Sequence, residues 1–361
     1  MRKISVKNCR PGMVLAKPIY NDIGRILIGK DVELTHTMIT RLLHLGIDSV
    51  FIHDSRTDDI IIEDVLSDKT REQALKTIKH TFQEIYHERI INRPFVKGQL
   101  ADIFKPVMEN IIDELKQNRN AMLMLSNIYV RDLYLYTHSL NVTLYSVTMG
   151  IAKGFNKQQL FELGLGALLH DIGKTKIPLS ILEKRGPLTE EEFQLIKKHP
   201  EYGFQILRKE DGIPLLSAHC AYQHHERIDG SGYPRGVANK DIHTYAKIVA
   251  ISDVYDAVVS RRVYKEPKLP HEALELLYIG VDQDFEREWV DIFKRTIAIY
   301  PVGSSVKLSS GETGIVVDIN TKFPARPIVR ILENNEKGSL DEPYEVDLSK
   351  ELSKVIISCT C

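Results

Sequence analysis

The stretch NKQQLFELGLGALLHDIGK, residues 156–174, decides the fold of the central part of the chain. Asn156 is a preferred helix N-cap residue, and apolar residues follow it at helical spacing as far as Leu169. The polar pair His170-Asp171 comes directly after this apolar run. We therefore expect a buried helix that ends in an imidazole and a carboxylate.

Helical spacing of apolar residues extends outward from this stretch over residues 121–300, with little strand alternation. A capping box of Thr189 and Glu192 opens one of the helices. The last helix is mostly apolar, which is typical of a buried position. These features predict one helical bundle domain. Its helices are expected at about residues 133–151, 156–169, 189–199, 215–225 and 245–260.

The two ends of the chain have a different pattern from the bundle. The first 63 residues contain strand-like runs, and a short helix that Thr35 caps and Gly46 stops. The last 61 residues, which begin at Pro301, alternate like short strands. The chain is therefore predicted to be mainly α, with a small α+β N-terminal cap and a small β-rich C-terminal module. The expected divisions are residues 1–63, 64–120, 121–300 and 301–361.

Residues 64–120 are predicted to form a helical connector, because turn residues are few and apolar residues recur at helical spacing. The apolar face of this connector is incomplete. Two arrangements fit it equally well: the connector pairs with a second copy in a homodimer, or it packs onto its own neighbouring domain.

Composition excludes several classes of protein. With 43% hydrophobic and 27% charged residues, the 361-residue chain is not disordered, and a net charge of -1 argues against a partner such as duplex nucleic acid. There is no signal peptide and no 18-residue apolar stretch, so we expect a cytoplasmic protein without a membrane span. Four scattered cysteines do not make a disulfide framework. The terminal Cys359-Thr360-Cys361 is expected to be a plain unpaired tail, with a reactive cysteine pair or a weak metal site as the alternatives.

The helical domain concentrates metal-ligand residue types, since six of the 13 histidines lie between residues 138 and 225. Imidazoles and carboxylates suit Fe, Mn or Zn, and a set this large exceeds the needs of one ion. Two ions about 3.5–4 Å apart can share a hydroxide and clamp both oxygens of a phosphoryl transfer. The pattern therefore indicates phosphoester hydrolysis. The group comprises His138, His170, Asp171, His199, His224, His225 and Asp253.

Three motifs in this domain resemble the signature of HD-GYP domains, the HD-superfamily phosphodiesterases that degrade cyclic di-GMP. They are HDIGK at 170–174, HHER at 224–227 and DGSGYP at 229–234. The resemblance implies metal-dependent hydrolysis of cyclic di-GMP to linear pGpG, with further cleavage to GMP left open. It also implies two divalent ions, with Fe or Mn as the expected metals.

The same resemblance assigns roles to individual residues. Asp171 and Lys174 would be catalytic, with Lys174 reaching an oxygen of the scissile phosphate, and Arg262 and Lys265 would hold substrate phosphates. Tyr233 is a candidate substrate contact within a loop that the family links to partner proteins. The metal ligands would be His170, Asp171, His199, His224, His225 and Asp253, with His138 available to them.

One position departs from a pattern found in some family members, which carry a glutamate four residues before the first ligand histidine. Here that position is Tyr134, a poor ligand when neutral. We therefore expect two metals rather than three.

Two other functions remain open from the sequence. The chain is either a non-catalytic regulator that binds a cyclic dinucleotide or a signalling partner, or an HD hydrolase for a related cyclic dinucleotide or another phosphoester. The intact ligand set favours an enzyme, because a pure binding protein does not need every metal ligand.

Overall fold

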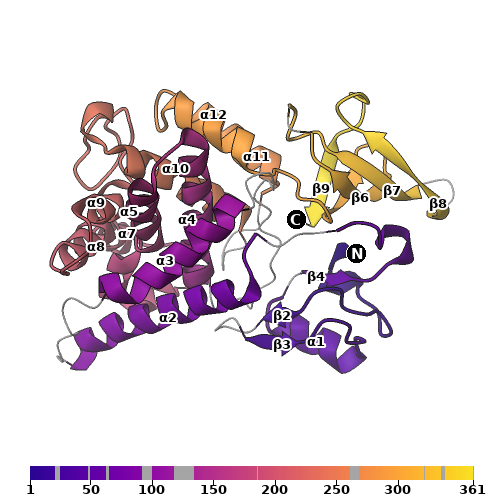
Figure 1. The fold of residues 1–361 in the computed structure, drawn as a ribbon, viewed down its shortest axis with the longest axis horizontal. Helices are drawn as coiled ribbons and strands as arrows, with labels where there is room; N and C mark the ends of the chain where they lie inside the picture. Colours follow the sequence, from indigo (N-terminus) through magenta and orange to yellow (C-terminus); the bar gives the residue numbers. More distant parts are fainter. Residues whose placement is uncertain are drawn as a thin grey trace.

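The computed structural model describes most of the chain, with side chains throughout except at residues 87–91 and 134. The described residues are 1–20, 25–47, 49–61, 65–91, 100–117, 134–184, 186–260, 268–320, 322–334 and 338–360. Among them the predicted fold class is confirmed: a helical bundle carries a small α+β module at one end of the chain and a small β-sheet at the other (Figure 1).

The bundle is built around α5, the helix predicted from residues 156–169. Asn156 forms a capping box with Gln159, and α5 is buried over most of its length. The capping box of Thr189 and Glu192 is present at the start of α7. The helices of the bundle are α4 (Tyr134–Lys153), α5 (Lys157–Leu168), α6 (Leu179–Leu182), α7 (Glu190–Ile196), α8 (His199–Leu207), α9 (Leu215–Gln223), α10 (Thr244–Val259), α11 (Pro270–Ile279) and α12 (Arg287–Thr296), with short 3-10 helices η4 (Ile172–Lys176) and η5 (Asn239–Asp241).

The connector forms two helices, α2 (Asp68–Ile91) and α3 (Leu100–Gln117), which lie alongside each other and against the bundle (Figure 1). Ile78 and Phe82 of α2 and Phe104 and Ile111 of α3 are buried in the same apolar cluster as the bundle core. Of the two arrangements that the sequence allowed, packing onto the neighbouring domain is the one seen within this chain.

The terminal modules consist of short elements. The N-terminal module has two antiparallel strand pairs, β1 with β4 and β2 with β3. The C-terminal sheet is antiparallel, with strand order β8-β7-β6-β5-β9. The bounds are β1 (Arg2–Ser5), η1 (Val6–Asn8), β2 (Ile19–Tyr20), β3 (Ile26–Ile28), α1 (His36–His44), β4 (Ser49–Ile52) and η2 (Ser55–Thr57), then β5 (Ser305–Leu308), β6 (Thr313–Asp318), β7 (Ile328–Asn334), β8 (Gly338–Asp347) and β9 (Ile356–Thr360).

The two terminal modules share one apolar core, although they stand at opposite ends of the sequence. Ile315 of β6 and Leu332 of β7 are buried in the cluster formed by the N-terminal module. The guanidinium of Arg330 contacts the carboxylate of Asp59 at 2.6 Å, and the backbone of Lys3 donates to the carbonyl of Gly303. Figure 1 shows the two chain ends close together on the same side of the molecule.

Leu332→Ala is expected to lower the free energy of unfolding by about 2–5 kcal/mol, because it removes a buried side chain from this shared core. Urea denaturation followed by circular dichroism measures the change. Leu352→Ala is the matched control, since Leu352 is 67% exposed. Equal stability of the two variants would show that the shared core contributes nothing.

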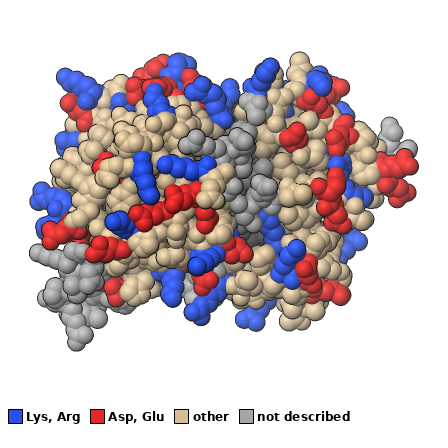
Figure 2. All heavy atoms as spheres, in the orientation of Figure 1, with Lys and Arg blue, Asp and Glu red and all other residues tan. Residues whose placement is uncertain are grey.

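The surface carries charges of both signs. Figure 2 shows Lys and Arg interspersed with Asp and Glu over the visible face, in keeping with the net charge of -1. Within the described part of the chain, every helix is too short or too polar to cross a bilayer.

Candidate metal centre

The seven side chains proposed as metal ligands converge from separate elements of the bundle. Two groups of them have ligand atoms that all lie within 4.8 Å of one another: His138 with His170 and Asp171, and His199 with His224 and His225. The seven residues come from α4 (His138), the turn after α5 (His170, Asp171), the first residue of α8 (His199), the segment after α9 (His224, His225) and α10 (Asp253).

Asp171 stands between the two groups. Its Oδ1 lies 3.3 Å from Nε2 of His199, whereas its Oδ2 lies 3.4 Å from Nε2 of His170. Burial would raise the pKa of this carboxyl, but Lys174 and the neighbouring imidazoles hold it well below its usual value. An ionised carboxylate that presents one oxygen to each group has the arrangement of a bridging ligand.

Backbone carbonyls fix the orientation of three imidazoles. Nδ1 of His170 lies 2.7 Å from the carbonyl of Ala167, and Nδ1 of His199 lies 2.7 Å from that of Ile196. Nδ1 of His224 has the same kind of partner, the carbonyl of Ala221 at 3.0 Å. Because a carbonyl only accepts hydrogen bonds, each Nδ1 carries a proton, and Nε2 of each neutral ring is a bare acceptor that faces the cluster.

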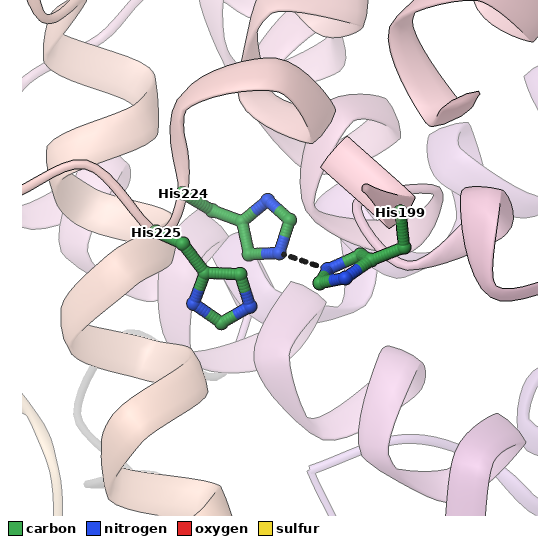
Figure 3. A group of neighbouring side chains, drawn as sticks. All are labelled: His199, His224 and His225. Carbon is green, nitrogen blue, oxygen red and sulfur yellow. Dashed lines mark hydrogen bonds between the residues drawn. The ribbon is translucent and has the colours of Figure 1, made fainter. Parts of the chain in front are cut away.

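These unprotonated Nε2 atoms are suited to binding a cation. Nε2 of His199 and Nε2 of His224 face each other at 3.2 Å (Figure 3). Burial lowers the pKa of His199 to about 4, so the pair does not hold a proton near neutral pH. In addition, Nε2 of His170 and Oδ1 of Asp171 are buried without a hydrogen-bond partner. Imidazole nitrogens and a carboxylate oxygen aimed at one point are the donor set of a divalent transition metal.

A second carboxylate system orients His138. Its Nε2 lies 3.1 Å from Oδ1 of Asp253, and its Nδ1 lies 2.7 Å from Oδ2 of Asp256. Asn141 donates to the other oxygen of Asp256 at 2.8 Å. Burial would lower the pKa of His138, but the bonds to Asp253 and Asp256 raise it to about 9. Asp256 was not predicted as a site residue; its position three residues after Asp253 on α10 was the available signal.

Asp256→Asn is expected to weaken metal binding about 10–100-fold, because a carboxylate that holds the far nitrogen of a ligand histidine fixes its tautomer and ring orientation. Titration calorimetry with Mn²⁺ and metal analysis of the purified protein measure the effect. Asp211→Asn, an exposed carboxylate of the same domain, is the control. Unchanged affinity in Asp256→Asn would contradict the positioning role.

Gly173 allows the HDIGK segment to reach the rest of the cluster. A Cβ atom at this position would lie 1.9 Å from the carbonyl oxygen of His199 and 2.5 Å from the nitrogen of Gly203. Only glycine therefore lets η4 pack directly on the start of α8. This contact brings His199 next to Asp171.

The DGSGYP segment folds back onto the HHER segment. The ring of Tyr233 stacks on His225 with a centroid distance of 4.6 Å, and a Cβ on Gly232 would lie 2.4 Å from the nitrogen of Arg227. The buried carboxylate of Glu226 accepts hydrogen bonds from the backbone of Arg235 and Val237, at 2.9 and 3.0 Å. Glu226 was not predicted as a functional residue, and its part is to hold this loop over the histidines.

Of the remaining residues singled out from the sequence, the structure places Lys174 at the site and leaves three undescribed. Lys174 is one-quarter exposed, and its Nζ lies 2.5 Å from Oδ2 of Asp171. Arg262 and Lys265 lie outside the described residues, as does the side chain of Tyr134.

Two regions of the chain match known domain families. Residues 106–288, just over half of the chain, match the HD domain, and residues 305–360 match a KOW domain associated with HD domains. The chain therefore belongs to the HD-domain family. The resemblance to HD-GYP proteins drawn from the sequence is confirmed.

Two curated relatives are cyclic di-GMP phosphodiesterases. One from Pseudomonas aeruginosa is 34% identical over 62% of this chain and 54% of its own length. One from Thermotoga maritima is 39% identical over 54% of this chain and 52% of its own length. The chain thus spans about half the length of each. A solved HDG"Y"P protein from Bdellovibrio bacteriovorus shares the fold, with a TM-score of 0.53 and 18% identity, over 81% of this chain and 97% of that one.

Proposed function

We propose that this protein hydrolyses cyclic di-GMP to linear pGpG with two divalent ions, Fe or Mn, bound by the two histidine groups and Asp171. The observation that carries the proposal is the facing pair of Nε2 atoms on His199 and His224, with Asp171 presenting one oxygen to each group. The activity of the relatives supports cyclic di-GMP as the substrate.

Ions bound there would lower the pKa of water and polarise the phosphodiester, which are the two requirements of this hydrolysis. The residues of the chain supply the rest. Lys174, held at Asp171 and partly exposed, would stabilise charge on an oxygen of the scissile phosphate. Asp256, at Nδ1 of His138, would hold that ring with its Nε2 toward the ions, and Asp253, whose Oδ1 lies beside the same Nε2, would be a further ligand.

Arg262 and Lys265 are proposed to bind substrate phosphates, since bidentate arginine and point-charge lysine suit that role. Tyr233 is proposed to lie beside the substrate, because it stacks on the ligand candidate His225. With Tyr134 in place of a glutamate, we propose two ions and pGpG as the first product.

The test is to purify the full chain anaerobically, load it with Fe or Mn, and identify the products of cyclic di-GMP by liquid chromatography. We expect conversion to pGpG and about two ions per chain. Binding of cyclic di-GMP without product under every metal would favour a non-catalytic regulator. Faster cleavage of a related cyclic dinucleotide in a competition assay would keep the chemistry and change the substrate.

Two partner proposals are tested separately. A homodimer through residues 64–120 is proposed from the sequence pattern; among the described side chains of α2 and α3, the large apolar ones are not exposed and would leave polar surface to such a contact. Light scattering of the purified protein measures whether it is a dimer.

A signalling partner at the DGSGYP loop is proposed from the family resemblance. Asp229→Arg should weaken binding of that partner without changing hydrolysis.

A further inference from the structure

Lys197 lies at the edge of the metal centre and has no part in the motifs discussed above. It follows α7 directly and stands two residues before His199. Its ammonium lies 5.5 Å from the ring centroid of Tyr233, which in turn stacks on His225, and 4.7 Å from that of Phe193. The side chain is therefore held between two aromatic rings next to the second histidine group.

Lys197 differs from nearby lysines in having no ion-pair partner within the described part of the chain. Lys174 pairs with Asp171 and Lys184 with Glu192, both at 2.5 Å, but no carboxylate among the described residues pairs with Lys197. The residue is also half-buried. Ring faces stabilise an ammonium by roughly 0.5–2 kcal/mol, but they do not accept its three N–H donors as an anion would.

We propose that Lys197 is a substrate-binding residue that donates to a phosphate of the cyclic dinucleotide. This inference rests on the proposed function and adds a cation on the side of the centre formed by His199, His224 and His225. Lys174 serves the side formed by His170 and Asp171. A cyclic dinucleotide carries two phosphodiesters, so cations on both sides of the centre match its charge.

The experiment compares the adjacent lysines in the full-length protein. Lys197→Gln is expected to weaken binding of the phosphorothioate analogue of cyclic di-GMP about tenfold, the loss of one charge-assisted hydrogen bond. The KM for cyclic di-GMP should rise by a similar factor, with kcat within about twofold. Lys198→Gln is the control, because Lys198 is the adjacent lysine and its side chain is exposed. Lys197→Arg should restore most of the affinity.

The salt dependence of the affinity distinguishes a direct phosphate contact from a purely structural role of Lys197. The difference in affinity between wild type and Lys197→Gln should shrink as ionic strength rises, because screening weakens a phosphate contact. Equal affinities of the two glutamine variants, or a salt-independent difference, would overturn the inference. Failure of the wild type to bind or cleave any cyclic dinucleotide would instead overturn the proposed function.

Discussion

Asp171→Ala is expected to abolish hydrolysis of cyclic di-GMP, with a fall in kcat of at least about 10³-fold. Asp171 presents one oxygen to each histidine group, at 3.4 and 3.3 Å, so its removal should prevent two ions from being held side by side. Charge stabilisation by metals is worth several kcal/mol, and roughly 4 kcal/mol corresponds to that factor. Turnover should be measured together with the number of Mn²⁺ ions bound per chain.

Two controls separate the loss of ions from a loss of structure. Asp171→Asn keeps the size of the side chain and removes the charge, and it should be nearly as inactive as Asp171→Ala while it retains the circular dichroism spectrum of the wild type. Asp211→Ala removes an exposed carboxylate and should leave activity unchanged. Substantial turnover by folded Asp171→Ala would rule out the metal mechanism.

Gly173→Ala is expected to destabilise the protein by about 3 kcal/mol and to lose metal binding at the same time. The added methyl group would lie 1.9 Å from the carbonyl oxygen of His199, and no flexible side chain is there to move aside. The backbone of η4 or α8 must shift instead, at the upper end of the usual cost of overpacking. Either shift moves His199 away from Asp171.

Urea denaturation and Mn²⁺ titration measure the two effects. Gly29→Ala is the matched control, because its added methyl group would meet only Val32, at an ordinary contact distance of 3.8 Å. A Gly173→Ala variant with wild-type stability and metal content would show that this close contact does not position His199.

Local signals made the helices of the bundle predictable. Asn156 and Thr189 each use a side chain to cap a helix, and such a bond depends on residues only three positions apart. The residues of the metal centre could be named because their motifs are short and dense in ligand types. Their convergence depends on contacts between distant segments, such as Gly173 with His199, which no local pattern reveals.

Contacts between distant segments also explain why the roles of Asp256 and Lys197 could not be predicted from the sequence. Asp256 looks like an ordinary residue of an apolar helix until α4 places His138 and Asn141 against it. Lys197 looks like part of a solvated lysine pair until the DGSGYP loop brings Tyr233 over from 36 positions away. The shared core of the two terminal modules joins residues that are separated by most of the chain.

That shared core has a consequence for the order in which the molecule can form during its synthesis. The N-terminal module leaves the ribosome before the C-terminal sheet, and its core stays incomplete until Ile315 and Leu332 have been made. Contacts this distant in sequence form slowly, because the long intervening chain must first be brought together. The residues of the N-terminal module are therefore expected to reach their native packing only after the much later C-terminal strands have been synthesised.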